Sequence, residues 1–194
     1  MEDGGSVEGW QFKITDANGK ILDGSPFSTD EDGLILTGNL LPGQYTVEEL
    51  LPEDSLYECK GDNPQTVTIT QGEVADITFV NALRTGKVTV EKIDITGSPL
   101  AGATFRLEWS AEGSLWYPVT YSEAIVRGGC SNPDVEDGSL TTGADGILEW
   151  GNLYPSLQYR LTETKAPEGY KLLDKAAYEG ELPVDDLAIT VRVT

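Results

Sequence analysis

The sequence contains no histidine and only two cysteines among its 194 residues. Histidine is the commonest general base and a frequent zinc ligand, and two cysteines far apart in the chain cannot build a cysteine-rich metal cluster. No glycine-rich loop ends in Lys-Ser or Lys-Thr, so a nucleotide phosphate site is not indicated. We therefore expect no conventional enzyme, no metal and no cofactor.

Positive charge and long apolar runs are also scarce. Lys and Arg number 13 against 33 Asp and Glu, which gives a formal net charge of −20. Such a chain repels phosphate backbones and anionic lipid headgroups, so nucleic acid and membrane-surface partners are disfavoured. No run of about 18 apolar residues occurs, and the N-terminus lacks the regions of a signal peptide. We expect no membrane insertion in this segment.

Turn-forming residues, by contrast, are abundant. The chain has 22 glycines and 10 prolines, and turn pairs occur at Asn18-Gly19, Asp32-Gly33 and Asp145-Gly146. They separate short stretches in which apolar and polar residues alternate, a pattern typical of β-strands. With 39% hydrophobic and 24% charged residues, the composition suits one or two folded domains. The sequence predicts an all-β protein.

One pattern occurs twice, at residues 38–52 and 151–170. Each copy has a Gly-Asn-Leu turn, a strand of alternating residues and a proline-marked turn. Glu49 in the first copy and Glu163 in the second lie on the same face as the preceding inward apolar residues. A buried carboxylate without a partner costs several kcal/mol. Because the pattern is used twice, these two glutamates are candidate functional residues.

Three segments of the second half carry a family resemblance: Lys87–Asp94, Pro99–Leu107 and Glu163–Tyr170. Together they resemble the collagen-adhesin B-type repeat domains of Gram-positive surface adhesins and pilins. The resemblance implies two tandem prealbumin-like or immunoglobulin-like β-sandwich domains. It also implies that a Lys on the first strand and an Asn on the last strand are joined side chain to side chain, assisted by the glutamate.

We expect one domain at 1–84, a β-sandwich that lacks its first strand, and a second at 85–194, with a short linker at Arg84–Gly86 and an insertion in the second domain at about 109–140. In the first domain, strands are expected at Leu34–Thr37 and Ala75–Asn81. In the second domain, Lys92 is the expected donor lysine, and its acceptor is expected after Thr194. In the first domain, Asn81 is the expected acceptor, and its donor is expected upstream of the printed sequence. Lys13 is not that donor, because alternation places it on the outward face.

The resemblance gives Glu163 and Glu49 the role of proton shuttle for crosslinking. A lysine amine is ordinarily protonated and cannot attack an amide, but burial disfavours charged forms and makes the neutral amine available. Plainer alternatives exist in each domain. Lys92 and Glu163 can form a buried structural salt bridge. In the first domain, Glu48 can be the inward residue, and Asn81 can be a simple turn former.

The function implied is that of a structural stalk segment in a cell-wall-anchored bacterial surface adhesin or pilin. It would be extracellular, anchored through sequence outside these residues, with neighbouring domains of the same protein as partners. The alternative is a module that binds a host glycan or matrix protein through the insertion, whose aromatic residues are Trp109, Trp116, Tyr117 and Tyr121. Acidic turns at residues 16–19 and 30–33 resemble calcium loops but lack the completing bidentate glutamate.

The two cysteines lie in different domains. An exported protein meets an oxidising environment, in which two cysteines without partners in their own domains can pair with each other. We therefore predict a disulfide between Cys59 and Cys130, with two unpaired, buried cysteines as the alternative.

Overall fold

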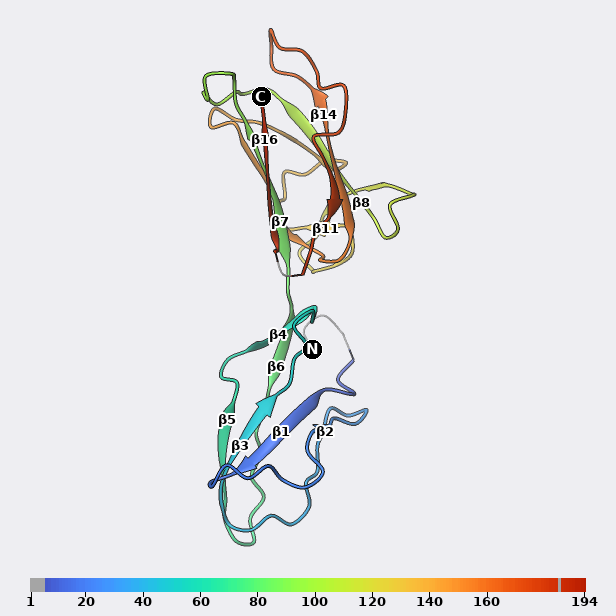
Figure 1. The fold of residues 1–194 in the computed structure, drawn as a ribbon. Coiled ribbons are helices and arrows are strands. Elements are labelled where there is room, and N and C mark those ends of the chain that lie inside the picture. Colours follow the sequence, from blue (N-terminus) through green and yellow to red (C-terminus); the bar gives the residue numbers. More distant parts are fainter. Residues whose placement is uncertain (1–5, 185) are drawn as a thin grey trace. The chain divides into compact units, whose positions relative to one another are not determined.

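The computed structural model describes residues 6–184 and 186–194, and these residues form sixteen strands and no helix. The chain divides into two compact units, Met1–Leu83 and Arg84–Thr194 (Figure 1). This boundary lies one residue before the one expected from the sequence. Because the described residues form no helix, none of them provides a helix that could span a membrane.

The first unit contains two antiparallel sheets. A four-stranded sheet has the order β2-β1-β3-β5, and β4 pairs with β6 in a second sheet. Its strands are β1 (Gln11–Asp16), β2 (Phe27–Ser28), β3 (Gly43–Glu49), β4 (Tyr57–Lys60), β5 (Gln65–Ile69) and β6 (Val80–Leu83).

The core of the first unit follows from alternation along two strands. Phe12 and Ile14 on β1, together with Tyr45 and Val47 on β3, form its buried apolar cluster. The ring of Phe79 lies 5.0 Å from that of Phe12, between ring centroids, although Phe79 itself is only partly buried. The alternation read from the sequence therefore assigns the inward faces of β1 and β3 correctly.

The described residues of the second unit form a five-stranded sheet, a three-stranded sheet and a two-stranded pair. The five-stranded sheet has the order β12-β8-β14-β15 with β9 added to β8, the three-stranded sheet has the order β13-β7-β16, and β10 pairs with β11. Its strands are β7 (Gly86–Lys92), β8 (Thr104–Ser110), β9 (Tyr117–Pro118), β10 (Thr120–Tyr121), β11 (Gly129–Cys130), β12 (Ser139–Thr141), β13 (Ile147–Leu153), β14 (Gln158–Lys165), β15 (Tyr178–Glu181) and β16 (Ala188–Val193).

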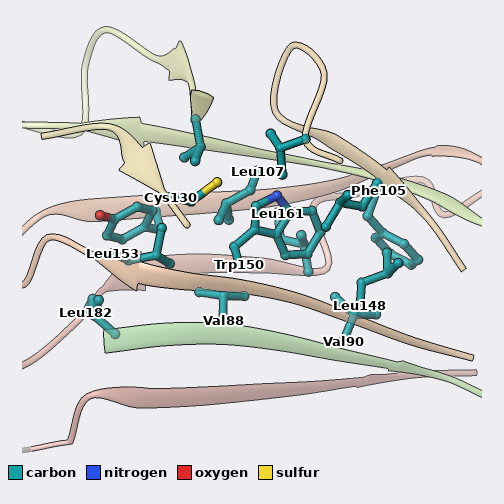
Figure 2. Packing of buried hydrophobic residues seen from close by; sticks show 14 of the residues in the cluster. Val88, Val90, Phe105, Leu107, Cys130, Leu148, Trp150, Leu153, Leu161 and Leu182 are labelled. Atoms are coloured by element: carbon teal, nitrogen blue, oxygen red, sulfur yellow. The ribbon is translucent and has the colours of Figure 1, made fainter. Parts of the chain in front are cut away.

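The core of the second unit lies between the five-stranded and the three-stranded sheet (Figure 2). Val88 and Val90 on β7 and Trp150 on β13 come from one sheet, and Phe105 on β8 and Leu161 on β14 come from the other. All five are fully buried. The inward side chains of each strand are two residues apart, as a pleated strand requires. This sandwich fixes the positions of the strands that carry Lys92 and Glu163.

Of the strands predicted in the first unit, Leu34–Thr37 is absent, and Ala75–Asn81 is reduced to its last two residues, which begin β6. The internal repeat matches them with β13 and β16 of the second unit, and both of those strands pair with β7. The described residues of the first unit include no strand equivalent to β7. Residues 34–37 and 75–79 therefore have no strand between them to supply their ladder hydrogen bonds, so the first of these predictions was wrong and the second was only partly right.

Candidate functional site

The second unit places a lysine and a glutamate together inside the sandwich. Lys92 is the last residue of β7, and Glu163 is the sixth residue of β14. Each is 2% exposed, and Lys92 Nζ lies 3.3 Å from Glu163 Oε1. The other carboxylate oxygen, Oε2, accepts a hydrogen bond of 3.0 Å from the backbone N–H of Leu173. Oε1 accepts no hydrogen bond, so the contact with Lys92 is an ion pair that lacks hydrogen-bond geometry.

The backbone of Lys92 is held on both sides. Its N–H donates to the carbonyl oxygen of Gly146 at 2.8 Å, and its own carbonyl accepts from the N–H of Leu100 at 2.9 Å. Gly146 has φ of +70°, and a Cβ at this position would lie 2.4 Å from the carbonyl oxygen of Lys92. Only glycine fits such a contact without backbone movement. The Asp145-Gly146 turn therefore fixes the end of the lysine strand.

Strand β16 runs parallel to β7, with Val193 in register with Lys92. Ile189, Val191 and Val193 are the less exposed residues of β16. The next position on that face is the second residue after Val193, where the acceptor asparagine is expected.

The first unit places a glutamate and an asparagine together instead. Glu49 ends β3 and is 3% exposed, and Asn81 on β6 is 8% exposed. Asn81 Nδ2 donates to Glu49 Oε1 at 2.5 Å. Glu49 Oε2 and Asn81 Oδ1 are both buried and have no hydrogen-bond partner. An unsatisfied buried polar atom is costly, so a further hydrogen-bond donor at this site would be stabilising.

Glu49 is positioned by a residue that the sequence analysis did not identify. The Asn63 side chain accepts a hydrogen bond from Glu49 N at 2.8 Å and donates one to the Glu49 carbonyl at 3.0 Å. This double contact fixes the backbone of Glu49 at the end of β3. Nothing in the repeat pattern indicates it, because the second unit holds Glu163 by other contacts.

The structure places Glu48 and Lys13 on the outward face. Lys13 Nζ pairs with the Glu48 carboxylate, and their side chains are 36% and 38% exposed. Glu49 and Asn81 lie inside, in contact with each other. The alternatives in which Glu48 points inward or Asn81 only forms a turn do not fit this geometry. No lysine among residues 6–83 is placed beside Asn81.

Some of the aromatic residues of the insertion contact side chains of β8 and β14. The Arg160 guanidinium lies 4.4 Å from the ring centroid of Trp116, and the rings of Trp109 and Tyr117 lie 5.6 Å apart. Tyr117 and Tyr121 remain 50% and 45% exposed. These contacts mainly fasten the insertion to β8 and β14.

A depression of about 750 Å³ lies beside the end of the insertion and carries four carboxylates. They belong to Asp134, Glu136, Asp137 and Glu149. Within the part of the chain that the structure describes, no group of three or more His, Cys, Asp or Glu side chains is arranged to hold a metal ion.

Cys59 and Cys130 are both free thiols in this structure. Cys130 is 1% exposed and packs in the core of the second unit, where Figure 2 shows its sulfur among the apolar side chains. Burial raises the pKa of the Cys130 thiol. A disulfide between Cys59 and Cys130, which lie in separate units, stays a prediction.

Cys59 instead lies beside the site of the first unit. It is on β4, in register with Asn81 on β6. Burial, and then the nearby Glu49 carboxylate, raise the pKa of the Cys59 thiol from 9.0 to about 11. The thiol is therefore protonated at neutral pH and belongs to the surroundings of Glu49.

Comparison with known proteins gives one family match and several structural neighbours. The family model described as SpaA, a prealbumin-like fold domain, matches residues 1–83 and again residues 86–194. No curated protein matches the chain significantly.

Three solved structures illustrate the structural likeness. The TIE protein of Bacillus anthracis is 20% identical over all of this chain and 31% of that chain, with a TM-score of 0.63. A streptococcal ancillary pilin is 24% identical over 95% of this chain and 56% of that one, with a TM-score of 0.41. The pilus 2b backbone protein of group B streptococcus is 21% identical over 100% of this chain and 82% of that one, with a TM-score of 0.43.

The chain thus spans about a third of the length of the first of these structures and about half of the second. At such identities the likeness is one of fold. The expected prealbumin-like sandwich is confirmed, and the family model accounts for almost every residue in two consecutive copies. The chain belongs to the SpaA prealbumin-like fold domain family, with two such domains in tandem.

Proposed function

We propose that this chain is a load-bearing segment of a Gram-positive surface protein, an adhesin or pilin, whose two domains are built for Lys–Asn crosslinks. The supporting observation is that each unit has a buried glutamate at the same position of the repeat, and that the two glutamates lie beside the two different groups that the crosslinking reaction would join. Glu163 lies beside a buried lysine, and Glu49 lies beside a buried asparagine amide. The two glutamates occupy corresponding strands in the internal repeat.

The chemistry needs no cofactor. The glutamate accepts a proton from the lysine ammonium, and the neutral amine attacks the asparagine Cγ. As the tetrahedral intermediate collapses, the original amide nitrogen takes up the proton held by the glutamate and the extra proton of the attacking amine, and it leaves as ammonium. One C–N bond forms and one breaks, and the carboxylate is regenerated. The reaction runs once in each domain, so it is maturation of the protein and not turnover.

The geometry of each site supports a part of this scheme. In the first unit, Glu49 Oε1 already contacts Asn81 Nδ2, the nitrogen that leaves. In the second unit, Glu163 Oε1 is the oxygen nearest to the Lys92 amine, at 3.3 Å. Burial of both glutamates excludes water, which strengthens these electrostatic contacts and prevents hydrolysis. The bound groups are held in place before the reaction starts.

A crosslink here would have a mechanical consequence. Because β7 and β16 run parallel and side by side, a bond from Lys92 to the second residue after Val193 would join the ends of these two strands. Tension that enters through β7 would leave through that bond. Residues 93–194 would then carry no load, and the sandwich would not unfold under force.

An experiment on the first unit tests the proposal. The repeat aligns Val7–Ile14 with Leu100–Leu107, so residue 1 corresponds to Asp94. A copy of residues 86–93 joined directly before residue 1 therefore supplies a lysine in the register of Lys92. We expect the protein to lose about 17 Da, the mass of one ammonia, with a crosslink between the grafted lysine and Asn81.

Matched variants distinguish the chemistry from simple strand binding. Replacing the grafted lysine with arginine, or making Asn81→Ala, should abolish the mass loss and leave the grafted strand in place. Glu49→Gln should slow the reaction strongly, because it removes the proton acceptor. If the graft protects residues 34–37 and 75–79 from hydrogen exchange and yet no mass is lost, the proposed chemistry is wrong.

A further inference from the structure

Cys59 is in position to act on the site of the first unit. It pairs across the β4–β6 ladder with Asn81, and antiparallel partners project to the same face of a sheet. Its neighbours on β4, Glu58 and Lys60, are exposed and pair with each other. Glu49 is therefore the charged group that faces the Cys59 thiol from inside the unit.

The second unit shows which contact the glutamate requires. There the carboxylate of Glu163 accepts the backbone N–H of Leu173, ten residues further along the chain. In the first unit, no backbone N–H donates to the Glu49 carboxylate among the described residues, and Glu49 Oε2 has no hydrogen-bond partner while the side chain is 3% exposed. The residue ten positions after Glu49 is Cys59.

We propose that Cys59 is a positioning residue of the first unit's crosslinking site. Its thiol donates a hydrogen bond to the Glu49 carboxylate and so holds that carboxylate against the Asn81 amide. This inference rests on the proposed function. In this role the thiol does for Glu49 what the Leu173 N–H does for Glu163. Cys59 forms no bond to the substrate groups and acts only through the glutamate.

The protonation state of Cys59 agrees with this role. With a pKa of about 11, the thiol keeps its proton at neutral pH and is a donor, not a nucleophile. Cys59→Ser replaces the S–H donor with an O–H donor of similar size. Cys59→Ala removes the donor and leaves the Glu49 carboxylate less well fixed. Losing a hydrogen bond to a charged group should slow crosslinking by about tenfold.

The first arm of the test needs no crosslink. The full chain is alkylated with iodoacetamide between pH 7 and 12, and modification of Cys59 and Cys130 is followed separately by peptide mass mapping. For Cys59 we expect the rate to reach half its maximum near pH 11, and to do so at a lower pH in the Glu49→Gln variant. Glu58→Gln, which changes an outward carboxylate on the same strand, is the matched control and should leave the midpoint unchanged.

The second arm uses the chain with residues 86–93 grafted before residue 1. Cys59→Ser should crosslink at nearly the unaltered rate, and Cys59→Ala should be about tenfold slower while the grafted strand still protects its neighbours from hydrogen exchange. Equal rates for the Ser, Ala and unaltered chains would overturn the inference. So would a Cys59 midpoint that Glu49→Gln does not move. If the unaltered grafted chain does not crosslink, the proposed function fails, and the positioning role falls with it even if the titration shows the contact.

Discussion

Replacement of Lys92 by methionine removes one partner of the buried ion pair in the second unit. Lys92 and Glu163 are each 2% exposed, with 3.3 Å between Nζ and Oε1. In Lys92→Met, the Glu163 carboxylate keeps only the hydrogen bond from Leu173 N–H. A buried charge left in this way costs about 3–5 kcal/mol of unfolding free energy. Methionine fills nearly the same volume, so little of this cost should come from packing.

Removing both charges should recover most of that loss. In the double variant Lys92→Met/Glu163→Gln, the neutral amide oxygen still accepts the Leu173 N–H, and no unpaired charge remains. Replacing both members of a buried pair by neutral groups is often neutral or stabilising. We expect the double variant to lie within about 1 kcal/mol of the original chain, much closer than either single variant.

Guanidinium unfolding followed by tryptophan fluorescence measures these differences, because Trp109, Trp116 and Trp150 all belong to the second unit. The matched control is Arg192→Met, which breaks an ion pair with Glu91 whose side chains are 67% and 33% exposed. Exposed pairs contribute about 0–1 kcal/mol. If Lys92→Met lowers the unfolding free energy no more than Arg192→Met does, the buried ion pair does not contribute the stability stated above.

Three further changes test the geometry. Gly146→Ala should destabilise the second unit by about 3 kcal/mol in the same unfolding assay, because its Cβ would meet the Lys92 carbonyl at 2.4 Å in a backbone conformation that alanine disfavours. Gly128→Ala should cost about 2 kcal/mol and alter the near-ultraviolet circular dichroism, because a Cβ there would lie 2.1 Å from Trp109 Nε1. Lys13→Ala should leave the mass loss of the grafted chain unchanged, because this lysine faces outward; a reduced mass loss would contradict that orientation.

Alternation alone predicts the buried faces that matter most. The period of two along β3 and β14 places Glu49 and Glu163 inside, and the same reasoning places Lys92 inside and Lys13 outside. These positions are predictable because each strand has one face toward a core, so that a shift of one residue would expose the apolar side chains.

The contacts that hold the glutamates are not predictable in this way. Asn63 bonds the backbone of Glu49 from a loop, and the Leu173 N–H reaches the Glu163 carboxylate from another loop. The paths of these loops depend on the tertiary structure and not on a repeating pattern. The first unit also departs from the expected strands at 34–37 and 75–79. Strand propensity is not enough there, since a strand needs a neighbour with which to pair.

The mass of a chain extended at both ends tests the central claim most directly. Residues 86–93 are copied before residue 1, and Asn-Ala-Leu, the sequence of residues 81–83, is added after Thr194 to place an asparagine at the next inward position of β16. We predict a mass about 34 Da below the value calculated from the sequence, one ammonia for each domain, with crosslinks mapped to Asn81 and Lys92. A folded protein whose mass equals the calculated value would contradict the account.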